Sequence, residues 1–300
     1  KNGEEQLPMA STTKIATALT VLDELTENGD ESRLDETFSV PASCCGVEGS
    51  SVYLKEGEDT TARELLYGLM LRSGNDCAAT LAVRVSGSIK KFAEKMNQTA
   101  MRAGALHTRF KNPHGLPEKG HYTTARDLSM ITALALENKT FAKIVNTRRY
   151  EPKNWTNKNK MLAEYDGAFG VKTGYTKQAG RCLVSAAERN GMSLICTVLN
   201  CSDTYGESKK LLDDAFAAYD LSLLQEAENP VPLDTKAGKI SAKTGKDLRY
   251  PLLSAELPYV KKTTIAFDSP QKDGNGREIY GQLRIYLANS LLFSENLFKL

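Results

Sequence analysis

The segment GRCLVSAAERNGMSLICTVLN, residues 180–200, carries the clearest secondary-structure signal in the sequence. Two apolar runs flank the dipeptide Asn190-Gly191, and both residue types tolerate the positive φ angles of a two-residue hairpin turn. The segment therefore predicts a tight antiparallel β-hairpin. In that pairing Cys182 does not face Cys196, so we expect no disulfide bond between them.

A short tripeptide precedes this hairpin directly, in GVKTGYT at residues 170–176. Lys172-Thr173-Gly174 has a second copy, Lys243-Thr244-Gly245, in SAKTGKD at residues 241–247. Lys, Thr and Gly are common residues, so the tripeptide alone indicates nothing. The context of each copy has to separate them.

Helical patterns dominate the region before the hairpin. Ser11 opens STTKIATALTVLDEL, residues 11–25, where apolar residues recur at helical spacing and predict a buried helix. Thr61 and Glu64 have the spacing of a capping box, which predicts a helix start. We expect helices at 61–71, 76–85, 88–103, 124–137 and 206–219, and short strand-like pieces within 31–59.

Length and composition indicate a soluble globular protein. The 300 residues are 41% hydrophobic and 25% charged, which is enough for a large buried core. The formal charge of +2 gives no electrostatic case for nucleic-acid binding. No apolar run approaches the roughly 20 residues that span a bilayer. Residues 1–14 lack the layout of a secretion signal, as a trimmed chain also would.

The texture of the sequence changes after about residue 225. Beyond it the sequence has no helical period, and alternating runs with Pro and Gly turns continue through GQLRIYL, residues 281–287. We therefore expect one mixed domain at 1–224 and a small all-β domain at 225–300.

The cysteines and histidines give no sign of a metal site. The chain has six cysteines and no CxxC pair, so we expect free thiols and no structural zinc. Pro and Gly residues separate His107, His114 and His121, which therefore cannot share one helical face. We expect neither a metal nor another cofactor.

Ser11 and Lys14 have S-x-x-K spacing at the start of the first expected helix. Residues three apart share a helix face, so the lysine amine lies beside the serine hydroxyl. A lysine whose pKa is lowered by burial and nearby positive charge can accept the serine proton. The alternative is a capping serine followed by a surface lysine, and Ser88 and Ser269 begin matches of that kind. The apolar helix after Ser11 favours the catalytic interpretation.

The motifs S-x-x-K at Ser11, S-x-N at Ser73 and K-T-G at Lys172 follow one another along the chain. This order resembles the signature of penicillin-binding proteins and class A β-lactamases. PMASTTK, NPHGL, HYTTARDL and residues 170–195 are similar to the low-molecular-mass D-alanyl-D-alanine carboxypeptidases, from about residue 7 to 225. The resemblance implies a serine β-lactamase/penicillin-binding-protein-like α/β (α+β) fold, in which helices flank an antiparallel sheet. Lys243 then belongs to an unrelated match.

The resemblance implies catalytic roles for the motif residues. Ser11 attacks the carbonyl of the penultimate D-Ala and forms an acyl-enzyme, and Lys14 accepts its proton. Ser73 relays that proton towards the leaving D-Ala amine. The backbone N–H groups of Ser11 and Tyr175 form the oxyanion hole.

The resemblance also implies substrate-binding roles. Asn75 holds the substrate's amide, and Lys172 both keeps Lys14 partly neutral and attracts the substrate's terminal carboxylate. Thr173 hydrogen-bonds the same carboxylate, and Gly174 lets the peptide pair along the strand edge. The implied partners are peptidoglycan pentapeptides ending in D-Ala-D-Ala and, as covalent inhibitors, β-lactams.

The chain departs from the family pattern in several places. Ten residues precede Ser11 where members usually have strands, and CSDTYGESKKLL lacks the Arg that many members use to hold the carboxylate. The family implies an extracytoplasmic location in the bacterial cell envelope. An export signal and a C-terminal membrane-binding helix would both be segments not present in this chain.

Two other functions compete with this hypothesis. A serine β-lactamase shares the acylation step but adds a Glu in an E-x-x-L-N stretch, and Glu137-Asn138 is the closest match between the second and third motifs. A cell-wall-binding module could keep the fold and lose catalysis. Intact motif residues argue against the second alternative.

Overall fold

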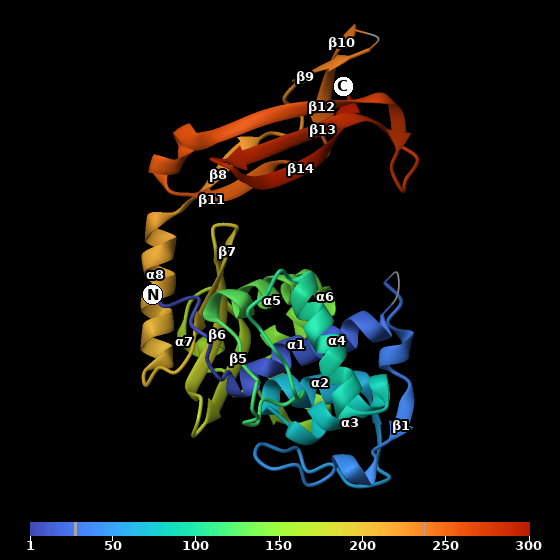
Figure 1. Cartoon of the computed structure of the whole chain (residues 1–300), viewed down its shortest axis with the longest axis vertical. Helices are drawn as coiled ribbons and strands as arrows, with labels where there is room; N and C mark the ends of the chain where they lie inside the picture. The colour runs from blue at the N-terminus through green and yellow to red at the C-terminus, as the bar shows by residue number, and fades with distance from the viewer. Residues whose placement is uncertain (27–28, 237) are drawn as a thin grey trace. The chain divides into compact units, whose positions relative to one another are not determined.

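The structure is a computed structural model that describes residues 1–26, 29–236 and 238–300 (Figure 1). The chain divides into two compact units, Lys1–Leu212 and Asp213–Leu300. The division falls inside helix α8 (Thr204–Ala218), whereas the sequence predicted it at 224/225. Strand β8 (Asp220–Gln225) pairs with β11 (Leu248–Leu252), so it belongs to the second unit.

Helix α1 (Lys14–Leu25) is the centre of the first unit and follows a 3-10 turn at Ala10–Thr13. Helices α3 (Asn75–Ser86), α4 (Ile89–Arg102), α5 (Ala125–Glu137) and α6 (Lys139–Asn146) pack against it. Helix α2 (Ala62–Tyr67) continues into a π-helical turn at Gly68–Arg72, which also contacts α1. The sequence predicted these helices except α6 and the short α7 (Met161–Glu164).

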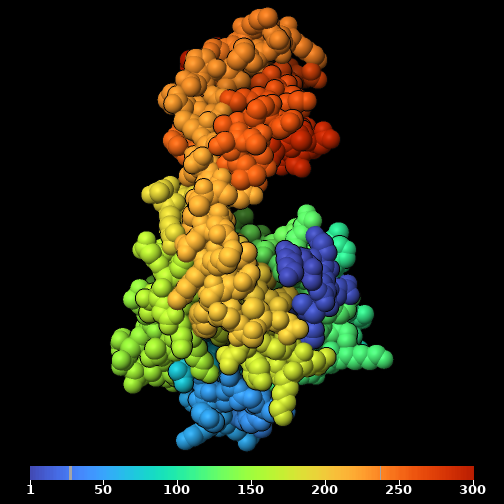
Figure 2. Space-filling model, turned by 90° about the vertical axis from the view of Figure 1, so that its left-hand side faces the viewer, coloured from blue at the N-terminus to red at the C-terminus, as the bar shows by residue number. Residues whose placement is uncertain are grey.

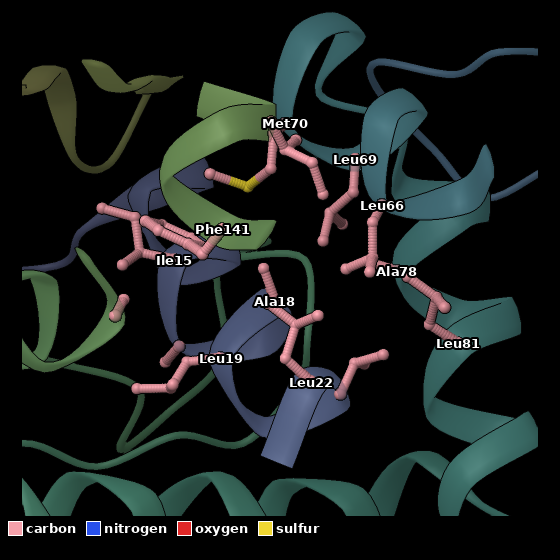
Figure 3. Close-up of a cluster of buried hydrophobic side chains, with 14 of the residues drawn as sticks. Ile15, Ala18, Leu19, Leu22, Leu66, Leu69, Met70, Ala78, Leu81 and Phe141 are labelled. Atoms are coloured by element: carbon pink, nitrogen blue, oxygen red, sulfur yellow. The ribbon is translucent and has the colours of Figure 1, made fainter. Parts of the chain in front are cut away.

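Residues 14–22 of α1 are all buried in this unit, which explains the apolar residues at most of these positions. Figure 3 shows Ile15, Leu19 and Leu22 from α1 facing side chains of α2, α3 and α6. Phe141 of α6 is completely buried among them. A helix placed this way holds its first residue, Lys14, rigidly, because moving it would disrupt the close-packed core.

The sheet of the first unit contains β5 (Ala168–Thr176), β6 (Gly180–Arg189) and β7 (Met192–Val198) in that order, all antiparallel. Asn190 and Gly191 form the β6–β7 turn with φ angles of 53° and 77°, which confirms the predicted hairpin. Cys196 lies opposite Ser185 rather than Cys182. All six cysteines are free thiols. Helix α5 packs on β7, and α6 and α7 pack on β5.

Short elements connect these parts. The segment expected to contain strand-like pieces forms β1 (Thr37–Ser39), which pairs with β2 (Asp59–Thr61). Strands β3 (Arg149–Tyr150) and β4 (Trp155–Thr156) form another small pair. The N-terminal segment, dark blue in Figure 2, lies on the surface of the unit, where Leu7 pairs with Thr123.

Apart from the end of α8 and a 3-10 turn at Ser254–Tyr259, the regular structure of the second unit is β-strand, as the sequence predicted. Its larger sheet has the order β12-β13-β14-β10-β9 among the described residues. These strands are β9 (Val231–Thr235), β10 (Gly238–Thr244), β12 (Val260–Lys272), β13 (Glu278–Leu287) and β14 (Ser290–Lys299). Leu233, Leu283 and Leu297 are nearly completely buried in its core. In the described part of the chain, no helix has both the length and the apolar character needed to cross a membrane.

Candidate active site

The amine of Lys14 is the centre of the candidate site. Its Nζ lies 2.9 Å from Oγ of Ser11, which sits in the 3-10 turn just before α1. The same Nζ donates to Oδ1 of Asn75 and to the backbone carbonyl of His114, both at 2.7 Å. Lys14 is completely buried, so these acceptors replace the water that would otherwise solvate its amine.

The pKa of Lys14 is held well below its usual value. Burial contributes most, because it disfavours the charged amine, and the positive charge of Lys172 adds to the effect. Both effects favour the neutral amine, which is the form that can accept a proton. The neutral amine can take the proton of a serine hydroxyl within hydrogen-bond reach.

The segment NPHGL, residues 112–116, positions the third acceptor of Lys14. Gly115 has a φ angle of +87°, and a Cβ there would lie 1.9 Å from the carbonyl oxygen of Ala10. The Gly115 N–H donates to Oδ1 of Asn112 at 2.8 Å. Glycine is therefore required at this position, because only glycine combines that backbone conformation with so close an approach.

Ser73 reaches the site from the end of the π-helical turn after α2. It has left-handed backbone angles, φ 65° and ψ 32°, and is 5% exposed. A serine in this conformation is uncommon, and its side chain lines the same cavity as Ser11.

Asn75 contacts the protein through both atoms of its amide. Its Oδ1 accepts from Lys14, and its Nδ2 donates to the carbonyl of Glu48 at 2.5 Å. It is 3% exposed and does not line the cavity that contains Ser11. The sequence analysis assigned Asn75 to the substrate's amide, and that role stays a prediction.

Asp76 anchors the loop that forms one wall of the site, and the sequence analysis missed it. Its carboxylate is completely buried and accepts hydrogen bonds from the hydroxyl of Ser51 and the backbone N–H groups of Val52 and Leu54. The backbone N–H of Asn75 donates to the carbonyl of Ser50 at 2.7 Å. Because a buried carboxylate needs these donors, the loop at 50–54 is fixed to the start of α3.

Strand β5 places the K-T-G motif beside the serine. Lys172 is 2% exposed, and burial together with the charge of Lys158 lowers its pKa to about 7. Its Nζ donates to the carbonyl of Thr173 at 3.0 Å. A Cβ at Gly174 would lie 3.1 Å from the backbone nitrogens of Ser11 and Thr12, so glycine permits the strand to approach the serine turn.

A cavity of about 440 Å³ opens over these groups. Its walls carry cationic side chains from two segments, the loop before α7 and strand β6. The lining residues are Ser11, Ser50, Ser73, Lys158, Lys160, Thr173, Gly174, Tyr175, Arg181, Cys182, Thr204 and Tyr205. No acidic residue is among these lining residues, so the cavity favours an anionic ligand.

The buried histidines His114 and His121 have structural contacts and do not form a common site. His121 accepts the Lys111 N–H at Nδ1, and its Nε2 contacts Oγ1 of Thr13 at 2.9 Å. Burial lowers the pKa of His121 to about 4 and that of His114 to about 3, so both rings are neutral at pH 7. Within residues 1–26, 29–236 and 238–300, no group of three or more His, Cys, Asp or Glu side chains could hold a metal ion.

The structure thus brings Ser11, Lys14, Ser73, Asn75 and the 172–175 segment together in one unit. Lys243 lies in β10 of the second unit and forms an ion pair with Glu228 at 2.7 Å. The sequence analysis did not find Lys158 or Arg181. Arg181 lies in the strand that precedes the predicted Asn190-Gly191 turn, so its place in that strand could have been read from the sequence. Lys158 lies in a loop and has no sequence signal.

Comparisons with known proteins agree with this geometry. Residues 1–203 match a protein family described as D-alanyl-D-alanine carboxypeptidase, Peptidase S11. The chain is 32% identical over 266 residues to D-alanyl-D-alanine carboxypeptidase DacF of Bacillus subtilis, covering 85% of this chain and 66% of that protein. It is 38% identical over 220 residues to a D-alanyl-D-alanine carboxypeptidase of Streptomyces sp. K15, covering 66% of this chain and 74% of that protein.

Solved structures give the same assignment. Penicillin binding protein 5 from Haemophilus influenzae has a TM-score of 0.79 at 25% identity, over 100% of this chain and 91% of that one. The Streptomyces K15 DD-transpeptidase has a TM-score of 0.67 at 33% identity, over 72% of this chain and 90% of that one. The chain belongs to the D-alanyl-D-alanine carboxypeptidase family of serine peptidases.

Proposed function

We propose that this protein is a serine-type D-Ala-D-Ala carboxypeptidase, which removes the terminal D-alanine of peptidoglycan stem peptides through an acyl-enzyme on Ser11. One observation carries the proposal. The Nζ of a wholly buried lysine, Lys14, lies 2.9 Å from the Ser11 hydroxyl, next to a cavity lined by cations. A serine in these surroundings is an activated nucleophile with a nearby base.

Acylation follows from the positions of the motif residues. Neutral Lys14 takes the Ser11 proton while Oγ bonds to the carbonyl carbon of the penultimate D-Ala, and the carbonyl oxygen becomes an oxyanion. The backbone N–H groups of Ser11 and Tyr175 would stabilise that charge. Ser73, which faces the same cavity, relays the proton to the departing amine as the C–N bond breaks. Water then hydrolyses the ester and frees Ser11.

The remaining residues bind the substrate or adjust the pKa and position of Lys14. The edge of β5 is the surface along which the substrate peptide pairs, and Thr173 hydrogen-bonds the terminal carboxylate. Lys172 lies beneath this edge and adds positive charge that lowers the pKa of Lys14. Asn75 holds Lys14 in place through the 2.7 Å contact.

The proposed substrate and location go together. Peptidoglycan pentapeptides ending in D-Ala-D-Ala lie outside the cytoplasmic membrane, so we place the enzyme in the bacterial cell envelope. β-Lactams would acylate Ser11 in the same way, because their carbonyl can occupy the same oxyanion hole.

A β-lactamase activity has less support from the site. Glu137 ends α5 and Asn138 caps α6, and neither lines the cavity. In the described residues, the cavity lining offers no carboxylate to activate water against an acyl-enzyme. We therefore expect the penicilloyl-enzyme to be long-lived.

Release of D-alanine from a peptide ending in D-Ala-D-Ala tests the proposal directly. The protein should release it, and Ser11→Ala should abolish both release and covalent labelling by a fluorescent penicillin. Rapid nitrocefin turnover without a stable acyl-enzyme would favour the β-lactamase. A protein that neither releases D-alanine nor becomes labelled would instead support a non-catalytic binding module.

A further inference from the structure

We propose that Arg181 binds the terminal carboxylate of the substrate, an inference that rests on the proposed function. Arg181 lies in β6, directly opposite Tyr175 of β5. Paired residues in an antiparallel ladder project to the same face of the sheet. Arg181 and Tyr175 both line the cavity that contains Ser11, which places the guanidinium beside the strand that carries the K-T-G motif.

Thr173 projects from the same face of β5, two residues from Tyr175. It is therefore a diagonal neighbour of Arg181, at a separation of roughly 7–8 Å that a long side chain can bridge. Thr173 lines the cavity as well. One carboxylate lying between the two strands could accept hydrogen bonds from the threonine hydroxyl and the guanidinium together.

The arginine is fixed at its base and available at its tip. Its backbone carbonyl accepts the Cys201 N–H at 3.0 Å, and the ladder with Tyr175 holds the other side. The side chain is exposed and has no ion pair or hydrogen bond with any residue that the structure describes. An exposed guanidinium without a protein partner, in a cavity lined by no acid, is a site for an external anion.

The other cations of the site suit this role less well. Lys172 is 2% exposed, and its Nζ donates to the carbonyl of Thr173. Lys158 and Lys160 line the cavity from the loop before α7 and are not part of the β5–β6 ladder. Arginine also presents two parallel N–H donors, which match the two oxygens of a carboxylate. The segment 201–212 before and within α8 contains no arginine that could do this instead.

The test compares a peptide ending in D-Ala-D-Ala with its C-terminal carboxamide, which lacks the negative charge. D-Alanine or D-alaninamide release is measured as kcat/KM for both substrates on each variant. Arg181→Gln should lower kcat/KM for the carboxylate roughly 10- to 100-fold and change the carboxamide by less than about twofold. For Arg181→Lys, kcat/KM with the carboxylate substrate should lie between the wild-type and Arg181→Gln values, because lysine keeps the charge without the planar fork.

The matched control is Lys177→Gln, which removes an exposed cation from the turn between β5 and β6, outside the cavity. It should leave the ratio of the two substrates unchanged. The ratio is measured within each variant, so a loss of folded protein does not alter it. An Arg181→Gln enzyme that keeps the wild-type ratio, or loses both activities equally, overturns the assignment. Wild-type protein that releases nothing from either substrate contradicts the proposed function itself.

Discussion

The Oδ1 atom of Asn75 lies 2.7 Å from Nζ of Lys14, so the second motif of the site contacts the base of the first. Both groups are buried, and both remaining acceptors of the lysine are uncharged. Burial and then the positive charge of Lys172 lower the pKa of Lys14, and no carboxylate is among the acceptors of its amine to oppose them. An amide rather than an acid at residue 75 therefore helps to keep the pKa of Lys14 low.

Asn75→Asp should hold Lys14 in its charged form. A carboxylate at this distance favours the charged amine and so raises the lysine pKa, and acylation at neutral pH should slow roughly 10-fold or more. The rate relative to that of the wild type should recover as pH rises. Acylation by a fluorescent penicillin, followed across pH, measures this shift. Asn75→Ala removes the contact without adding charge, and a shift to higher pH in that variant would show that charge is not the cause.

The pKa of Lys172 predicts a descending limb in the pH profile of kcat/KM. With a pKa of about 7, Lys172 is cationic below neutral pH and loses its charge above it. The value of kcat/KM for a carboxylate substrate should therefore fall as pH rises through about 7, with a slope of one proton. Lys158→Gln removes a positive neighbour, which raises the Lys172 pKa and should move this limb to higher pH.

Lys160→Gln is the matched control for that shift. Lys160 lines the same cavity, but burial and Lys158 are what lower the Lys172 pKa. The limb should stay in place in this variant. Equal shifts in the two variants would mean that the net charge of the cavity, rather than Lys158 in particular, sets the limb.

Asp76 should matter for stability more than its place beside a motif suggests. Asp76→Ala leaves the N–H groups of Val52 and Leu54 without their acceptor, which should reduce the free energy of unfolding by about 2–4 kcal/mol. Urea denaturation measures the change. Asp203→Ala, which removes an exposed acceptor of the Gly206 N–H at the start of α8, should cost only about 1 kcal/mol. Similar losses in both variants would contradict an anchoring role for Asp76.

The parts of the fold that the sequence predicted are those that local patterns determine. Asn190-Gly191 specifies its turn through backbone conformation, and the apolar spacing after Ser11 specifies a buried helix. Helix α6 was missed because it is only eight residues long and follows α5 after the single residue Asn138. Strand β8 is identified by its partner β11, a pairing that no local pattern in the sequence specifies.

The site was predictable where a motif fixes both residue type and place. Ser11, Lys14, Ser73 and the 172–175 segment were named in this way, but the contact between Asn75 and Lys14 was not. That contact joins residues 61 positions apart, and the lysine's third acceptor is a backbone carbonyl 100 positions away. Backbone groups have no sequence signature, so tertiary packing alone reveals them.

The second unit should be dispensable for acylation, since every motif residue lies in the first. A shortened chain ending at Ala218 keeps α8 whole and removes β8, whose partner β11 would be lost as well. It should react with fluorescent penicillin at a rate within about threefold of the full chain, provided that near-ultraviolet circular dichroism shows native packing. A well-folded shortened chain that fails to react would contradict the assignment of acylation to the first unit alone.

The two copies of K-T-G give the last prediction. Lys172→Ala removes the buried charge beside Lys14 and should slow acylation by penicillin roughly 100-fold, since one electrostatic contact in a dry site contributes about 3 kcal/mol. Lys243→Ala removes the same residue type from the same tripeptide in β10, where it pairs with Glu228 near the surface. A surface ion pair contributes about 0–1 kcal/mol to stability, so the acylation rate should stay within about twofold. The acylation rates of the two variants, measured side by side at one pH, show which K-T-G copy belongs to the active site. A larger loss from Lys243→Ala would show that the assignment of the third motif is wrong.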